Sequence, residues 1–196
     1  MIKVINRCTW PSNDALMIEY HDNEWGVPVH NDQKLFEFIV LDAFQAGLSW
    51  KTILHKRENF RDAFHNFDIQ RVASMGEDDF EHLMQNAGII RNRAKIQATF
   101  GNARAFLKIQ QEFGSFDKYI WQFVDNKPIV HSIKMQNEAC DYIVKTKESD
   151  EMSKALIKRG FKFVGSTICY AFMQAAGLVN DHFIDCYRYK EVQKLK

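Results

Sequence analysis

Two cysteines and two histidines near opposite ends of the chain could bind one metal ion. Cys8 and His21 lie near the N-terminus, and His182 and Cys186 lie near the C-terminus, at a spacing that fits one helix or helical turn. Two thiolates and two imidazoles are typical of a tetrahedral Zn²⁺ site with no open position, which is structural and not catalytic. Because the two pairs are far apart in the sequence, their spacing alone favours the alternative of unrelated core cysteines and surface histidines.

A single carboxylate interrupts an otherwise apolar run. Asp42 stands within FIVLDAF, residues 38–44. The helix expected here is apolar almost all round, which predicts the central buried helix of the fold. An unpaired buried carboxylate is costly, so Asp42 should be either satisfied by a partner or functional. The alternative is that it faces a gap filled with solvent or caps the next element. The following residues, Gly47 to Trp50, predict a tight turn that exposes Leu48 before a new helix.

Aromatic residues are plentiful, with sixteen Phe, six Tyr and four Trp, and some of them lie beside polar groups. The segment YHDNEWGVP, residues 20–28, places Tyr20, His21 and Trp25 at the end of a short expected helix. These side chains could line a pocket. Trp25 could equally be an ordinary core residue, which the number of aromatic residues favours.

A glycine-containing turn near the C-terminus is flanked by lysines. Residues 158–167 read KRGFKFVGST and predict a helix–hairpin–helix, in which two helices are joined by a short turn. The turn amides and the N-terminus of the second helix can bind a DNA phosphate without sequence preference, and nearby lysines favour such binding. The glycine pattern is weak by itself, because any corner between two helices needs such a turn.

The distribution of charge is more informative than its sum. The net charge is +1 and the pI is near 7.7, so the whole chain does not indicate a nucleic-acid-binding protein. Residues 91–108 nevertheless contain five basic and no acidic residues, and residues 154–165 contain four basic and no acidic residues. These runs could bind DNA, although solvated helix faces are the commoner explanation.

Helices must position all these residues. Caps and periodicity predict helices that begin near Ser12, Asp32, Ser49, Ser115 and Ser149, a long helix over about 91–112, and a last apolar helix that Gly177 ends. Short helices are expected at 68–74 and 77–86, and residues 125–150 are expected to form a long connection. Without alternating apolar runs, the predicted fold class is all-α, a two-lobed helical bundle that forms one domain, 1–196.

The composition is that of an ordinary globular protein, with 46 % hydrophobic and 26 % charged residues in 196. The N-terminal residues lack the apolar run of a signal peptide, and no segment is apolar enough for a membrane span. We therefore expect a cytoplasmic protein without a membrane partner, whose four cysteines are reduced.

Several long motifs in this chain resemble the 3-methyladenine DNA glycosylase I family. The resemblance extends over roughly residues 7–186 and rests on RCTW, YHDNEWGVP, LFEFIVLDAFQAGLSW, NAGIIRNRAKI and KRGFKFVGSTICYAFMQAAGLVNDH, in family order. It implies the fold of the helix–hairpin–helix glycosylase superfamily, with the hairpin at residues 163–167 on DNA phosphates. It also implies one structural Zn²⁺ ion, with the ligands Cys8, His21, His182 and Cys186.

The activity implied by this resemblance is base-excision repair by hydrolysis of an N-glycosidic bond, which releases 3-methyladenine from alkylated double-stranded DNA. Trp50 would face the cationic base, surrounded by Trp10, Tyr20 and Trp25. Asp42 occupies the position of the family carboxylate that hydrogen-bonds the base edge. The implied DNA contacts are Leu48, as a wedge in the gap left by the flipped base, and Lys162, Gly165 and Thr167 at the hairpin. The enzyme would be a monofunctional monomer.

Two residues depart from the family pattern. The family has Glu where this chain has Asp42, which is shorter by about 1.5 Å of reach. The family also tends to have Tyr where this chain has Met17, and both positions are expected at the base pocket. These departures leave a second hypothesis, a DNA-damage-binding homologue with no efficient excision or with altered specificity.

Overall fold

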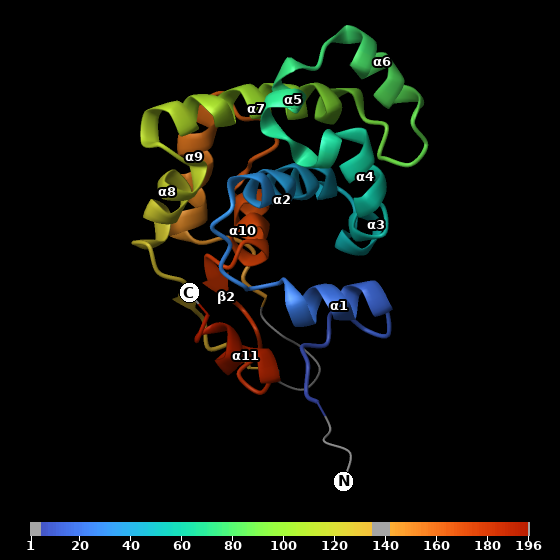
Figure 1. The fold of residues 1–196 in the computed structure, drawn as a ribbon. Helices are drawn as coiled ribbons and strands as arrows, with labels where there is room; N and C mark the ends of the chain where they lie inside the picture. The colour runs from blue at the N-terminus through green and yellow to red at the C-terminus, as the bar shows by residue number, and fades with distance from the viewer. Residues whose placement is uncertain (1–4, 135–141, 196) are drawn as a thin grey trace.

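The computed structural model describes residues 5–134 and 142–195, and these form a helical protein (Figure 1). The first half contains α1 (Ala15–Asn23), α2 (Asp32–Gln45), α3 (Trp50–Leu54), α4 (Arg57–Ala63), η1 (His65–Phe67), α5 (Ile69–Ser74) and α6 (Glu77–Gln85). The second half contains α7 (Arg93–Phe113), α8 (Phe116–Ile120), η2 (Trp121–Val124), β1 (Ile129–Val130), α9 (Lys147–Lys158), α10 (Ser166–Ala175), β2 (Val179–Asn180) and α11 (Tyr187–Val192). The all-α prediction is confirmed.

The central helix is α2, which lies between α7 and the terminal segments in Figure 1, beside α10. Its side chains are buried on almost every side, as its apolar sequence predicts, with Phe36 and Phe44 fully buried. Phe36 packs edge-on against Phe106 of α7, with ring centroids 5.4 Å apart, and Phe44 packs against Phe60 of α4 at 4.8 Å. This packing fixes α2, and therefore Asp42, between the surrounding helices.

Local capping explains where most helices begin. The predicted caps Ser49 and Ser115 are confirmed, because each side chain accepts a hydrogen bond from a backbone N–H in the first turn of its helix. Three other predicted caps are wrong by one to three residues: the observed caps are Asp14, Asn31 and Thr146 instead of Ser12, Asp32 and Ser149. Ser149 lies inside α9, and its hydroxyl accepts from the backbone N–H of Thr146.

The segment before α1 lies beside the start of α11. The backbone N–H of Tyr187 donates to the carbonyl of Asn6 at 3.0 Å, and the Asn6 side chain donates to the carbonyl of Asp185. In Figure 1, α1 and α11 lie below the larger group of helices that contains α2 to α10. Residues 125–150 were expected as a connection, and in the described part of that range the prediction is wrong in two places. β1 pairs in parallel with β2 in the register Ile129 to Val179, and α9 already begins at Lys147.

A glycine brings the α1–α2 connection onto the end of α10. Gly177 ends α10 as predicted, with a left-handed φ of +71°. A Cβ atom there would lie only 2.3 Å from the carbonyl carbon of Val27, so no other residue permits this approach. The N–H groups of Gly26 and Val29 donate to the carbonyls of Gln174 and Ala176. The connection is therefore fixed against α10.

No helix within the described residues is long and apolar enough to cross a membrane.

Candidate active site and metal centre

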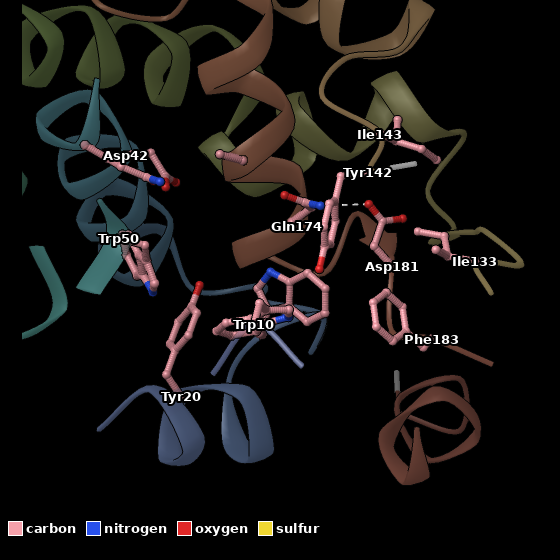
Figure 2. A pocket seen from close by; sticks show the side chains of 13 residues that line it. Trp10, Tyr20, Asp42, Trp50, Ile133, Tyr142, Ile143, Gln174, Asp181 and Phe183 are labelled. Atoms are coloured by element: carbon pink, nitrogen blue, oxygen red, sulfur yellow. Dashed lines mark hydrogen bonds between the residues drawn. The ribbon is translucent and has the colours of Figure 1, made fainter. Parts of the chain in front are cut away.

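A cavity of about 240 Å³ lies between the central helices and the terminal segments (Figure 2). Its lining comes from α1, α2, α3, α10, the N-terminal segment and the residues around β2. The lining residues are Trp10, Tyr20, Trp25, Asp42, Gln45, Trp50, Ile133, Tyr142, Ile143, Ala171, Gln174, Asp181 and Phe183. Most of this surface is aromatic or aliphatic, with a few polar groups that converge on the cavity, which is the usual composition of a small-molecule site.

Asp42 is the most unusual polar group in the cavity. Its side chain is only 2 % exposed, and its Oδ2 atom has no hydrogen-bond partner among the described residues. Burial raises the pKa of this carboxyl group well above its ordinary value. The structure therefore contradicts the alternative that Asp42 caps the next element, and it brings Asp42 into one cavity with Tyr20 and Trp50.

Two tryptophans also present unpaired polar atoms. The Nε1 atoms of Trp10 and Trp50 are buried without a hydrogen-bond partner among the described residues, and both side chains line the cavity. The ring of Tyr20 lies 5.0 Å from that of Trp50, and the ring of Trp25 lies 5.1 Å from that of Trp10. Buried polar groups are nearly always hydrogen-bonded. Their accumulation around one cavity therefore indicates a place for a polar, planar ligand.

Met17 does not line this cavity. It lies in a neighbouring groove that shares Trp10 and Trp50 with the cavity and includes Ser49 and Lys51. Of the two departures from the family pattern, Asp42 therefore lies in the cavity and Met17 in the adjoining groove; that the base binds in this cavity stays a prediction. Since α1 presents Tyr20 and Met17 three residues apart, the two side chains point into adjoining hollows.

Cys8, His21, His182 and Cys186 form one buried cluster. Their ligand atoms all lie within 4.8 Å of one another, and the side chains are at most 4 % exposed. The Cys186 Sγ atom lies 3.5 Å from Nε2 of His21 and 3.7 Å from Nδ1 of His182, and the Cys8 Sγ atom lies 3.6 Å from the same Nδ1. These four residues can hold a metal ion.

The ring nitrogens of the two histidines that face away from the cluster also form hydrogen bonds. Nδ1 of His21 donates to the Asp22 carboxylate at 2.7 Å, and Nε2 of His182 donates to the carbonyl of Trp25 at 3.0 Å. Such contacts fix the tautomer, so that Nε2 of His21 and Nδ1 of His182 are the atoms free to bind a metal. The hydrogen bond with the Cys8 thiol lowers the pKa of Cys186 well below its usual range.

The model of the methyladenine glycosylase family matches residues 10–189, which include all the cavity-lining residues and three of the four clustered metal-ligand residues. The chain belongs to the methyladenine glycosylase family.

Curated relatives and solved structures agree with this assignment. The chain is 55 % identical over 185 residues to DNA-3-methyladenine glycosylase 1 of Escherichia coli, covering 94 % of this chain and 97 % of that protein. It is 49 % identical over 180 residues to DNA-3-methyladenine glycosylase of Haemophilus influenzae, with coverages of 92 % and 96 %.

The same agreement holds in three dimensions. A crystal structure of 3-methyladenine DNA glycosylase I (TAG) is 54 % identical, with a TM-score of 0.88 and coverages of 93 % and 98 %. The Staphylococcus aureus enzyme, whose structure explains its recognition of 3-methyladenine, is 36 % identical, with a TM-score of 0.88 and coverages of 93 % and 96 %.

In this methyladenine glycosylase, α7 connects the turn that carries Leu48 with the turn between α9 and α10. Leu48 is 42 % exposed and follows the end of α2. The Nζ atom of Lys95 donates to the carbonyls of Phe44 and Ala46 at that helix end, and it lies 5.9 Å from the ring centroid of Phe163 in the other turn. The two turns therefore lie on the same side of α7.

The turn between α9 and α10 is fixed by buried polar side chains. Asn102 of α7 is 1 % exposed and both donates to the carbonyl of Lys162 and accepts from its N–H. Ser153 of α9 donates to the carbonyl of Val164 at 2.7 Å. At this turn Lys162, the cap residue Gly165 and Thr167 in the first turn of α10 are exposed.

Sequence reasoning missed a second polar group in the cavity of this family member. Asp181 is 4 % exposed and accepts hydrogen bonds from His131, Tyr170 and Gln174. The hydrogen bond that His131 donates to the Asp181 carboxylate raises the pKa of His131. Figure 2 places Asp181 and Phe183 across the cavity from Asp42. The sequence contained one indication of Asp181, which is its position directly before the candidate metal ligand His182.

Proposed function

We propose that this protein is a DNA-3-methyladenine glycosylase, which acts in base-excision repair by hydrolysing the N-glycosidic bond of 3-methyladenine in alkylated DNA. The observation that carries the proposal is the unpaired carboxylate of Asp42 in an aromatic cavity, in a chain 55 % identical to a DNA-3-methyladenine glycosylase. A monofunctional hydrolysis, without a lysine Schiff base, is part of this proposal.

The chemistry of the base suits the cavity. Methylation at N3 gives the adenine ring a positive charge, and an electron-rich indole face attracts a cation. Trp50 is the proposed stacking surface, and Trp10, Tyr20 and Trp25 complete an aromatic wall. The exocyclic amine of adenine is a hydrogen-bond donor, which suits the acceptor Oδ2 of Asp42. The positive ring also favours the ionised form of this carboxyl group, opposing the effect of burial.

The DNA contacts are proposed on the two turns that α7 holds together. Leu48, an exposed apolar side chain at a helix end, is the proposed wedge that fills the gap left by the flipped nucleotide. Lys162 and the amides at Gly165 and Thr167 are proposed to bind a phosphate at the N-terminus of α10, so that α9 and α10 act as a helix–hairpin–helix. The contacts of Lys95 with the Leu48 turn and Phe163 support a single DNA-binding side.

Replacing Asn102 with Ala is expected to weaken DNA binding without changing the affinity for free 3-methyladenine. The change removes both hydrogen bonds that hold Lys162, at a cost of about 1–3 kcal/mol in stability, and leaves the hairpin turn free to move. Fluorescence anisotropy with duplex DNA should show about 10-fold weaker binding. Ser74→Ala, a change at an exposed hydroxyl on α5, serves as the control, and equal DNA affinity in both variants would contradict the proposed positioning.

One Zn²⁺ ion is the proposed occupant of the cysteine–histidine cluster. A tetrahedral Zn²⁺ ion with Zn–S of about 2.3 Å and Zn–N of about 2.05 Å has sulfur–nitrogen edges of roughly 3.5 Å. Three of the four corresponding distances in the cluster are 3.5, 3.6 and 3.7 Å, and all four ligand atoms lie within 4.8 Å of one another. With four protein ligands no position is left for water, so the ion would hold the two chain ends together and take no part in hydrolysis.

A glycosylase assay tests the proposal. Duplex DNA treated with a methylating agent should release free 3-methyladenine when incubated with the protein, and chromatography measures the product. The alternative, a homologue that binds damaged DNA without excision, predicts binding without release. Relatives at 49–55 % identity are named as glycosylases, so this alternative is not favoured. Double-stranded DNA as the substrate, a monomeric state, a cytoplasmic location and a single domain over 1–196 stay predictions.

A further inference from the structure

The geometry points to Asp181 as a second catalytic carboxylate, which stabilises the positive charge that develops on the deoxyribose when the N-glycosidic bond breaks. This inference rests on the proposed function and adds a residue to it. Asp42 and Asp181 line the same cavity from opposite sides (Figure 2). If the base binds at Asp42 and Trp50, the sugar to which it is attached lies toward the other side of the cavity.

Three hydrogen bonds hold the Asp181 carboxylate in place. His131 donates to Oδ1 at 2.6 Å, while Tyr170 and Gln174 donate to Oδ2 at 2.6 and 2.8 Å. Three donors on its two oxygens fix the orientation of this carboxylate and prevent it from rotating. A carboxylate offers about four lone-pair sites, so these three bonds leave capacity for one more contact. Asp181 thus brings a fixed negative charge to a cavity that is otherwise largely apolar.

Glycoside hydrolysis explains why such a charge is useful. The bond between C1′ and the base breaks with its electron pair going to the base, which leaves as neutral 3-methyladenine. The deoxyribose then carries the positive charge as an oxocarbenium ion, which a nearby carboxylate stabilises. The oxygen of a water molecule bonds to C1′, and the water proton passes to solvent. A preorganised charge in a site with little water contributes most to such a step.

The three donors differ in their relation to the cavity. Gln174 lines it, whereas Tyr170 is buried behind it and His131 is partly exposed. We regard His131 as a positioning residue, because it acts on the reaction only through Asp181. Two further features favour a role beyond packing: the carboxylate lines the cavity, and its partners come from two separate segments, the β1 end and α10.

Replacing Asp181 with Asn removes the charge and keeps the shape of the side chain. We expect single-turnover release of 3-methyladenine to fall about 100-fold. The affinity for free 3-methyladenine, measured by quenching of tryptophan fluorescence, should stay within about 2-fold of the wild-type value because the base contacts are unchanged. Asp62→Asn, an exposed change on α4, is the matched control for the loss of one negative charge and should retain wild-type activity.

The possible outcomes separate the two proposals. Wild-type protein that releases no base would contradict the proposed function before any variant is compared. An Asp181→Asn rate within about 3-fold of the wild-type rate, or an equal loss of free-base affinity and excision, would overturn a catalytic role for Asp181.

If Asp181→Asn fails to fold, variants of His131 decide. His131→Ala should reduce the single-turnover rate about 10-fold with free-base affinity unchanged. His131→Asn should restore much of that rate, because its amide can donate from nearly the position of Nδ1. Wild-type rates in both variants would overturn the inference.

Discussion

Replacing Asp42 with Asn is expected to reduce the rate of 3-methyladenine release about 100-fold and, at the same time, to stabilise the folded protein. The loss of activity follows from removing the negative charge and one acceptor from the only unpaired carboxyl group on the described cavity wall. The gain in stability follows from removing a carboxyl group that is 2 % exposed and has an unsatisfied oxygen. Single-turnover kinetics and thermal unfolding measure the two effects.

The stability effect of Asp42→Asn should depend on pH. Burial raises the pKa of Asp42 in the folded state above its value of about 3.9 in the unfolded chain. Below that value both states are protonated, so the carboxyl group contributes no pH dependence. As the pH rises through the unfolded pKa, the unfolded state loses its proton first and the free energy of unfolding falls. The melting-temperature difference between variant and wild type should therefore widen from pH 4 toward neutral pH.

Asp42→Glu tests the shortened side chain directly. If the missing methylene limits contact with the base, the longer carboxylate should raise the excision rate, because hydrogen bonds tolerate less than about 1.5 Å of error. An unchanged or lower rate would count against a limit set by reach. Asp62→Glu adds the same methylene at an exposed position on α4 and is the matched control, which should keep the wild-type rate.

Replacing Cys186 with Ser is expected to release the bound zinc and to lower the melting temperature by about 10 °C. Cys186 contributes one of the two thiolates in the cluster and contacts both histidines. A loss of about 4 kcal/mol on removing such an ion shifts the melting temperature of a chain this long by roughly 2–4 °C per kcal/mol. Elemental analysis and thermal unfolding give the two readouts.

A second cysteine provides the control for this experiment. Cys169 is also buried, but it lies outside the cluster on α10, where its thiol donates to the carbonyl of Val164. Cys169→Ser keeps a donor at that position and should retain about one zinc ion per chain. Carefully prepared wild-type protein with far less than one ion per chain would contradict the zinc proposal.

Much of the secondary structure could be predicted from the sequence because it depends on near neighbours in the chain. Ser49 and Ser115 cap their helices through N–H groups three residues ahead, and Gly177 ends α10 through its own backbone conformation. The apolar run around Asp42 correctly predicted a buried central helix. Where two candidates lie close together, as with Thr146 and Ser149, local patterns are less decisive, since either hydroxyl can serve as the cap.

The family motifs in the sequence also indicated which residues could form the metal site and the base pocket, but not the distances between their side chains. His21 and Cys186 are 165 residues apart in the chain and 3.5 Å apart in space. Their meeting depends on how α1 and α11 pack beneath the central helices, and no local periodicity encodes that packing. Similarly, the sequence identified Asp42 as an exception in an apolar helix, while only the structure showed its Oδ2 atom unpaired in a cavity.

The assignment of Met17 and Asp181 required the tertiary structure. Met17 and Tyr20 are neighbours on α1, yet a small difference in direction places them in separate hollows. Asp181 was one acidic residue among many until His131, Tyr170 and Gln174 were found to converge on it. The sequence by itself determined most of the helices and identified the residues whose side chains could bind a ligand or take part in a reaction. The packing of α2, α10 and the chain ends decided which of them share a site, because long-range contacts arise only when separate elements pack together.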